Sequence, residues 1–239
     1  MIRTINKCFY DIFNNCRKNI FFSIISYNVV MVVSKNIAIV FFKKTKVLNV
    51  SKNIAIVMIF NTASIKIMQY FFNKPYEQIH LRELSRKTNT SIYSTKKIVD
   101  SLVNQKILTE KRQGNQRYIK PNMENQFFKQ LKIAFSIKKI YDSQILQHLE
   151  EKIPAISSVI LYGSTAQGKD DEKSDIDLLV IGQKNKIDIS KYEKKVNKEI
   201  NLLIMKWSEW RQHANQDKSF YREIVKDGIA LLGDIPVIE

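Results

Sequence analysis

The stretch that decides the fold is LYGSTAQGKDDEKSDIDLLV, residues 161–180. Near its end, Asp175 and Asp177 are separated by one apolar residue. Residues i and i+2 of a β-strand point to the same face, roughly 7 Å apart along the strand. The two carboxylates are therefore predicted side by side, and because like charges repel, both stay ionised most easily with a cation between them. Oxygen ligands of this kind favour Mg²⁺ or Mn²⁺.

The front of the stretch suits a phosphate group. The apolar run SSVILY (157–162) leads into Gly163, and Ser164 is placed to begin a helix. A strand-to-helix turn that contains glycine lets backbone N–H groups approach an anion, which the helix dipole also favours. The Ser164 hydroxyl adds a further donor. A phosphate-binding turn and a pair of metal-binding carboxylates are the two parts needed to handle a nucleoside triphosphate; the alternative is a surface loop followed by a capped strand.

The full pattern is an apolar strand, Gly-Ser, a spacer with glycine, Ser-Asp-x-Asp and a second apolar run. It resembles the signature of the nucleotidyltransferase superfamily that includes DNA polymerase β, the antibiotic nucleotidyltransferases and the minimal nucleotidyltransferases. The resemblance is close over residues 161–180 and loose over residues 155–232. It implies an α+β fold in which a mixed sheet is flanked by helices.

The resemblance also implies an activity. The enzyme would move an NMP from an NTP to a hydroxyl group of an RNA, a protein or a small molecule. Gly163 and Ser164 would bind the nucleotide, and Asp175 and Asp177 would be catalytic and would hold Mg²⁺ or Mn²⁺.

A third carboxylate often follows on a later strand in the superfamily, and here the chain departs from the pattern. Asn201 stands at the expected position, in the run EINLLIM (199–205). An amide can neither act as a base nor contribute a metal-binding charge. Glu199 lies two residues earlier, on the same strand face. Either Glu199 completes the catalytic set, or two carboxylates suffice, or catalysis has been lost.

The net positive charge of the chain comes entirely from residues upstream of this region. The chain of 239 residues has a net charge of +16, of which residues 1–60 and 61–121 each carry +8, whereas residues 122–239 are neutral. A basic block beside a neutral one indicates a polyanion-binding module attached to an enzyme-like module.

Residues 61–121 have the pattern of a small nucleic-acid-binding domain. Helices are predicted at 63–72 and 81–87, and a third after the N-cap Ser91, followed by a hairpin of strands 107–111 and 116–119 around Gly114. This order resembles a winged helix-turn-helix domain, in which the third helix enters the major groove of DNA. Winged helices also bind RNA or proteins, and basic side chains can simply solvate a small domain, so these alternatives stay open.

The resemblance assigns candidate DNA contacts on the third helix and on the wing. Base contacts give sequence preference and phosphate contacts give affinity. The candidates are Tyr93 and Ser94 for bases, Lys96 and Lys97 for phosphates, and Lys111, Arg112 and Arg117 on the wing.

Residues 125–149 carry apolar residues at spacings that suit one long helix, either continuous or broken once. Such a helix would connect the two modules. Its apolar face can pack against the next domain or support a homodimer.

The first sixty residues are unusual. VSKNIAIV occurs at 33–40 and again at 50–57.

A membrane span would need about twenty apolar residues and is not favoured, because Lys35 interrupts the apolar run. Met58 begins a stretch that is typical of the start of a domain. An alternative hypothesis is therefore that translation begins at Met58 and that residues 1–57 are not part of the native protein. Two cysteines, Cys8 and Cys16, match no zinc or disulfide pattern. We therefore expect a cytoplasmic protein.

The predicted organisation has four segments: an extension (1–57), a winged helix-turn-helix domain (58–121), a connecting helix (122–154) and a nucleotidyltransferase domain (155–239). A DNA-binding transcriptional regulator or antitoxin-like protein whose impaired transferase domain senses nucleotide is the alternative function.

Overall fold

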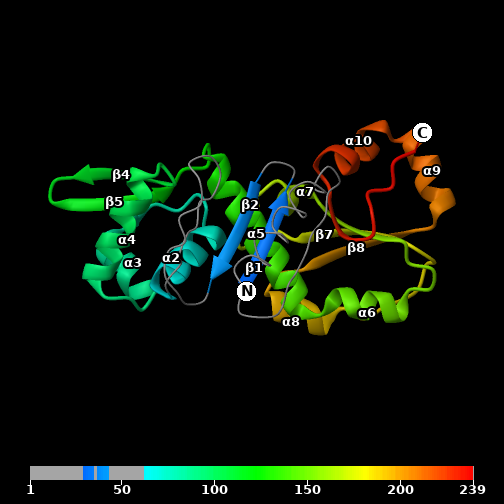
Figure 1. Cartoon of the computed structure of the whole chain (residues 1–239), viewed down its shortest axis with the longest axis horizontal. Coiled ribbons are helices and arrows are strands. Elements are labelled where there is room, and N and C mark those ends of the chain that lie inside the picture. The colour runs from blue at the N-terminus through cyan, green and yellow to red at the C-terminus, as the bar shows by residue number, and fades with distance from the viewer. Residues whose placement is uncertain (1–28, 35–36, 43–61, 239) are drawn as a thin grey trace, which may run out of the picture. The chain divides into compact units, whose positions relative to one another are not determined.

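The computed structural model describes residues 29–34, 37–42 and 62–238 (Figure 1). The chain divides into two compact units, Met1–Lys66 and Ile67–Glu239. In the first unit, β1 (Val29–Ser34) and β2 (Ile37–Phe42) pair antiparallel. The first VSKNIAIV copy spans the end of β1 and the start of β2. The second copy, Met58 and both cysteines lie outside the described residues.

A three-stranded antiparallel sheet and three helices lie in residues 62–121. The sheet has the order β3-β5-β4. The elements, shown in Figure 1, are α2 (Thr62–Asn73), β3 (Ile79–His80), α3 (Leu81–Lys87), α4 (Ile92–Asn104), β4 (Leu108–Gln113) and β5 (Gln116–Pro121). The predicted helices and hairpin are therefore present, and Gly114 adopts a φ of 56° in the two-residue turn between β4 and β5.

Helix α4 begins as the sequence predicts. The Ser91 hydroxyl accepts a hydrogen bond from the Ser94 N–H at 3.1 Å, so Ser91 is the N-cap. Thr95 and Val99 are fully buried on the inner face of α4. Ile92 fits the inward spacing but is 47% exposed, because it is the first residue of the helix and lies beyond the end of the packed face.

Two helices connect this region to a four-stranded sheet. They are α5 (Gln126–Ser143) and α6 (Ile145–Lys152), separated by Gln144 at a left-handed φ of 68°. The connector is therefore helical and is broken once, at Gln144. The apolar side chains of α5 are buried within the chain itself, including Phe128, Leu131 and Ile137. None of the helices in the described residues has the length and apolar character that crossing a membrane requires.

The four-stranded sheet is mixed and has the order β8-β7-β6-β9. Strands β7 and β8 run parallel, and the other pairs run antiparallel. The strands are β6 (Ser158–Tyr162), β7 (Ile176–Ile181), β8 (Ile200–Met205) and β9 (Ile229–Leu232). The accompanying helices are α7 (Gly163–Ala166), α8 (Ser190–Val196), α9 (Trp207–Gln216) and α10 (Lys218–Asp227). The predicted α+β class with a mixed sheet and flanking helices is confirmed.

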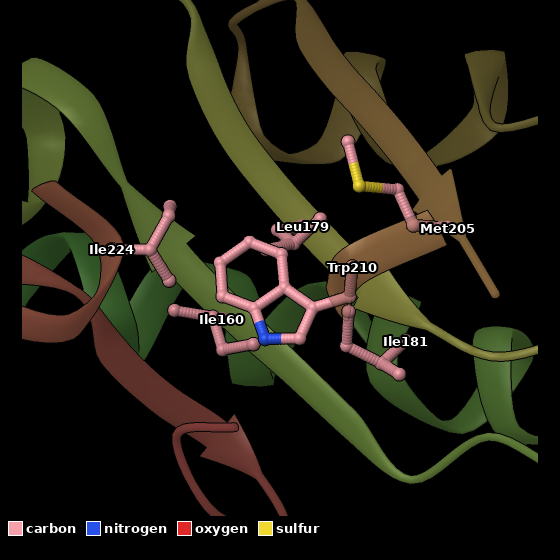
Figure 2. Close-up of a cluster of buried hydrophobic side chains, with 6 residues drawn as sticks. All are labelled: Ile160, Leu179, Ile181, Met205, Trp210 and Ile224. Atoms are coloured by element: carbon pink, nitrogen blue, oxygen red, sulfur yellow. The ribbon is translucent and has the colours of Figure 1, made fainter. Parts of the chain in front are cut away.

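Trp210 of α9 fills the space between the sheet and α10 (Figure 2). Its side chain is fully buried against Ile160, Leu179 and Ile224. The indole N–H donates to the Pro236 carbonyl at 2.7 Å, so its polar atom is satisfied. Trp210 thus packs α9 and α10 against β6 and β7, the strands next to Gly163 and Asp177.

Candidate active site

The parallel pairing of β7 and β8 brings the polar residues of both strands to one edge. Asp177 lies opposite Asn201 in the register, and Asp175 directly precedes β7. The Ile176 N–H donates to the Glu199 carbonyl at 2.9 Å, so the alignment extends to the residue before β8. Since side chains alternate along a strand, Asp175, Asp177 and Asn201 share a face.

Asn201 connects the two aspartates. Its side-chain nitrogen donates to Asp175 Oδ2 and to Asp177 Oδ1, each at 3.1 Å. One amide N–H₂ group has two donors, and both are used here. The two predicted carboxylates therefore converge on a single point, and a neutral donor offsets part of their mutual repulsion.

Gly163 places the predicted phosphate turn against Asp177. Its φ is +67°, and a Cβ added there would lie 3.2 Å from Asp177 Cγ and closer still to Oδ2. Any other residue would therefore press on the carboxylate and be strained in its backbone. The turn therefore lies directly beside the two aspartates, and Ser164 is the second residue of α7.

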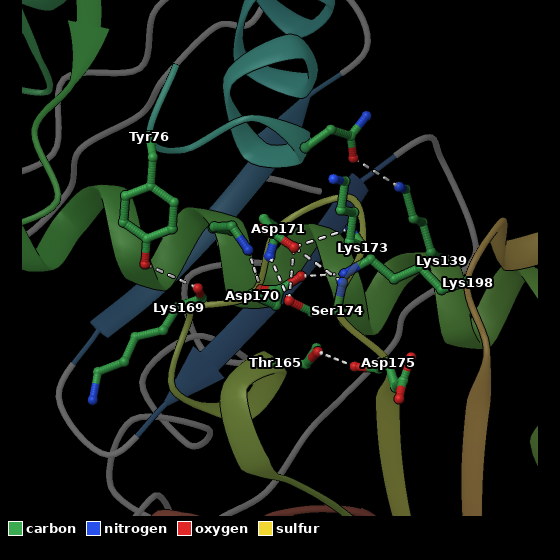
Figure 3. Close-up of polar contacts among 12 residues, drawn as sticks. Tyr76, Lys139, Thr165, Lys169, Asp170, Asp171, Lys173, Ser174, Asp175 and Lys198 are labelled. Atoms are coloured by element: carbon green, nitrogen blue, oxygen red, sulfur yellow. Dashed lines mark hydrogen bonds and ion pairs between the residues drawn. The ribbon is translucent and has the colours of Figure 1, made fainter. Parts of the chain in front are cut away.

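Thr165 ties the same turn to the start of β7. Its hydroxyl donates to the Asp175 carbonyl at 3.2 Å, and its side chain is fully buried (Figure 3). The backbone that carries Asp175 is thus held by the residue that follows Gly163 and Ser164.

Asp171 orders the spacer between the turn and the aspartates. Its Oδ1 accepts from the backbone N–H groups of Lys173 and Ser174 and from the Ser174 hydroxyl, at 2.9–3.0 Å (Figure 3). The Ser174 hydroxyl, together with these N–H groups, lowers the pKa of the Asp171 carboxyl. The residue types of an Asx turn were present in DDEKS, but the sequence reading did not use them.

Tyr162 is a further neighbour of the site that the sequence reading missed. It precedes Gly163 and pairs with Asp177 across β6 and β7. Burial raises the pKa of its phenol, and the charges of Asp177 and Glu223 raise it further. The phenol therefore stays protonated and can donate a hydrogen bond beside the carboxylates.

Glu199, the candidate third carboxylate, is exposed. The hydrogen bonds and ion pairs of the described residues include none from its side chain to Asp175 or Asp177. The side chain that touches both aspartates belongs to Asn201.

The site offers two carboxylates and one amide as potential metal ligands. No cluster of three or more His, Cys, Asp or Glu side chains able to hold a metal occurs among the described residues. Rotation of the Asn201 amide would present its oxygen in place of its N–H₂ group, and all three ligands would then be oxygen atoms of the kind that Mg²⁺ accepts. The residues present therefore fit a hard divalent cation.

The candidate nucleic-acid contacts lie on α4 and on the β4–β5 hairpin. Tyr93 is 76% exposed, and Lys96, Lys97, Lys111 and Arg112 are exposed as well. The Ser94 hydroxyl accepts from the Ser91 hydroxyl at 2.9 Å, in the capping arrangement at the start of α4.

Arg117 differs from the other wing residues. Its guanidinium lies 2.5 Å from Asp100 and 2.6 Å from Glu110, and only 15% of its side chain is exposed. It therefore joins β5 to α4 and β4, which the sequence could not indicate because Asp100 is seventeen positions away.

The part of the chain that contains the four-stranded sheet is similar to a known family. Residues 143–234 match the family model described as polymerase beta, nucleotidyltransferase. This range contains β6 to β9, α6 to α10 and both aspartates. Residues 143–234 are therefore similar to a nucleotidyltransferase domain.

The family model matches less than half of the chain. Several solved structures also match a part of the chain. A toxin–antitoxin crystal structure with AMP-PNP shares 23% identity, covers 38% of this chain and 72% of that chain, and has a TM-score of 0.29. A mutant of the MntA–HpeT toxin–antitoxin shares 21% identity over 39% and 72%, with a TM-score of 0.27. The adhesin competence repressor AdcR from Streptococcus pyogenes shares 14% identity over 39% and 68%, with a TM-score of 0.29. No curated protein matches the chain.

Proposed function

We propose that the chain is a metal-dependent nucleotidyltransferase that moves an NMP from an NTP to a hydroxyl acceptor, and that its N-terminal region binds duplex DNA. The observation that supports the transferase site most strongly is the convergence of Asp175 and Asp177 on one amide group, beside a glycine turn that has no room for a side chain.

Each residue of the site has a role in this proposal. Gly163 and Ser164 hold the β- and γ-phosphates through backbone N–H groups and the serine hydroxyl. Asp175 and Asp177 hold Mg²⁺ or Mn²⁺, which supplies positive charge against the charge that develops on the transferred phosphoryl group. The acceptor oxygen bonds to the α-phosphorus as the bond to the leaving pyrophosphate breaks. Glu199, exposed two positions before Asn201, is the candidate base for the acceptor proton.

Incubation with each labelled NTP, Mg²⁺ and total cellular RNA or protein tests the proposal. Label transferred to an acceptor supports the enzyme and identifies the base preference and the acceptor class together. A chain that binds NTP saturably without incorporation supports the second candidate, a nucleotide-sensing regulator. The second candidate is favoured by the amide of Asn201, which stands where the superfamily often has a carboxylate.

The Asn201→Asp variant tests the metal site. A third carboxylate at this edge adds a charged oxygen ligand but increases repulsion when no metal is bound. We expect the Tm without metal to fall, the Tm increase on adding Mg²⁺ to grow, and the Kd for Mg²⁺ to drop about tenfold. Differential scanning calorimetry and isothermal titration calorimetry measure these quantities.

Asn201→Ala is the matched control for the metal site. It also removes the amide but adds no charge, so it should not strengthen Mg²⁺ binding. A Kd for Mg²⁺ that is the same in Asn201→Asp and in Asn201→Ala would place the metal elsewhere.

The DNA-binding part of the proposal is supported by the element order and by charge. Two helices, a recognition-type helix α4 and a β4–β5 hairpin follow the order of a winged helix-turn-helix domain. Residues 61–121 carry a net charge of +8. In this arrangement Tyr93 and Ser94 lie at the start of α4, where base edges are read, and Lys96 and Lys97 contact phosphates. Lys111 and Arg112 contact the backbone from the wing, whereas Arg117 stabilises the wing through its acidic partners.

The double variant Lys96→Gln/Lys97→Gln should weaken DNA binding about equally for all sequences. Each lysine that contacts a phosphate releases about one counterion when the protein binds DNA. Without both lysines, the slope of the logarithm of the binding constant against the logarithm of the salt concentration should therefore decrease in magnitude by about two. Fluorescence anisotropy with a labelled duplex at several salt concentrations gives the slope. Lys152→Gln/Lys186→Gln, at two exposed positions of the transferase domain, removes the same charge and should leave the slope nearly unchanged. Equal effects of both pairs would indicate unspecific attraction, and tighter binding to RNA would favour the RNA alternative.

A further inference from the structure

Asp170 is a buried carboxylate shared by two lysines (Figure 3). The side chain of Asp170 is 4% exposed, its Oδ1 pairs with Lys132 Nζ, and its Oδ2 lies 2.6 Å from Lys198 Nζ. Lys132 is 1% exposed and Lys198 10%. Two ammonium groups therefore face one carboxylate in a region of low dielectric, where an uncompensated charge is costly.

Lys139 adds a third ammonium group to this cluster. It lies on α5 seven residues after Lys132, which is two helical turns and therefore the same side of the helix. Its Nζ has a neutral acceptor, Asn73 Oδ1, at 3.3 Å, and no carboxylate lies within ion-pair distance of it among the described residues. Burial lowers the pKa of Lys139, and the charge of Lys198 lowers it further, whereas the more weakly acting charge of Asp170 raises it.

These groups line a pocket between α2 and α5. Its volume is about 210 Å³, enough for a small ligand. Besides Lys139, Lys198 and Asp170, the lining includes three neutral polar side chains that can donate hydrogen bonds, Gln69, Asn73 and Ser136. Both oxygens of Asp170 already have lysine partners, so the pocket presents an excess of donors over acceptors.

The charges of the pocket lining match an anionic ligand. Lys139 and Lys198 against Asp170 leave a surplus of one positive charge in the lining, and buried Lys132, which also pairs with Asp170, lies outside it. Asp171 lies nearby, but its carboxylate accepts from Ser174 and from backbone N–H groups and does not line the pocket. A phosphate monoester carries about −1.5 to −2 at pH 7 and has three acceptor oxygens.

We propose that this pocket binds a small phosphate-bearing anion, with Lys139 and Lys198 as its cationic contacts. The site is separate from the proposed nucleotide site, since none of Gly163, Ser164, Asp175 and Asp177 lines it. It adjoins that site through Thr165, which lines the pocket and whose hydroxyl holds the Asp175 carbonyl. An occupant of the pocket would therefore contact the residue that fixes the backbone of Asp175.

The test uses the full chain in phosphate-free buffer, titrated with inorganic phosphate, pyrophosphate and AMP in separate arms. Calorimetry should show one phosphate site per chain and a higher Tm with each bound anion. The arm with the lowest Kd identifies the occupant as free phosphate, a diphosphate or a nucleotide.

Lys139→Met should weaken phosphate binding by about tenfold or more, because it removes a charge-assisted contact but keeps the aliphatic stem. Its Tm without phosphate should rise, because the repulsion by Lys198 is relieved. Lys139→Arg keeps the charge and should keep the binding. Lys138→Met, at the neighbouring exposed position, is the matched control and should bind as the native chain does.

Ser164→Ala separates this site from the transferase site, because Ser164 is the proposed phosphate contact there, and it should leave phosphate binding to the pocket unchanged. Absence of phosphate binding in the native chain, or equal binding in Lys139→Met, would overturn the proposal. Binding that is lost in Ser164→Ala and kept in Lys139→Met would assign the anion to the transferase site, which refutes the pocket but leaves the proposed function standing.

Discussion

The Asp177→Asn variant is expected to lose NTP-dependent transfer by about three orders of magnitude. The replacement keeps the size of the side chain and removes the charge that would hold a divalent ion beside the phosphates. Asp177 is also the residue against which the Gly163 turn lies, so the lost charge is at the centre of the site. The rate of label transfer from NTP to acceptor measures the effect.

The same variant should remain folded and bind DNA as the native chain does. Asp177 and Asp175 repel each other, so removal of one charge does not threaten the fold. Glu150→Gln, at an exposed position of α6, removes one carboxylate elsewhere in the domain and should retain full activity. Transfer at the native rate by Asp177→Asn would refute the assignment of the active site.

The Asp170→Asn variant should cause the largest loss of stability. It leaves Lys132 and Lys198 buried beside a neutral amide, and removal of one partner of a buried ion pair costs about 3–5 kcal/mol. For a folded region of this size, we expect the Tm to fall by about 10 °C. Thermal and urea unfolding followed by circular dichroism measure the change.

A double variant distinguishes this electrostatic effect from a simple packing defect. Asp170→Asn/Lys132→Met removes the buried ammonium together with its counter-ion, so it should recover part of the lost stability. Glu172→Gln, two residues away and exposed, should change the free energy of unfolding by less than about 0.5 kcal/mol. If the double variant is less stable than the sum of both single variants predicts, the charge argument is wrong.

The elements of the transferase domain could be predicted because each one has a local signal. The run IALL at 229–232 is strand β9 as expected, and the glycine-serine pair follows β6 directly. Alternating or continuous apolar residues report burial within a few positions of the chain. The same applies to Ser91, whose capping role depends only on its own first turn.

The polar partnerships could not be predicted because they join distant positions. Asp170 pairs with Lys132, 38 residues away, and with Lys198, 28 residues away. Both lysines look like solvated surface charges in the sequence. Arg117 likewise looks like a free wing residue, and only the folded hairpin brings it to Asp100.

Asn201 shows a different limit of the sequence. The sequence alone shows that Asn201 departs from the superfamily pattern. The parallel register of β7 and β8 places it opposite Asp177. The hydrogen bonds to both aspartates depend on the rotamer of its side chain, which no sequence pattern specifies.

Lys132 lies eleven residues before the first residue of the range that matches the family model, whereas its partner Asp170 lies inside that range. A fragment trimmed to the recognisable homology would keep the carboxylate and discard one of its two lysines. The range that matches the family model is therefore shorter than the range that forms the buried ion pairs. Biochemical work on the isolated catalytic portion needs helix α5 at its amino end.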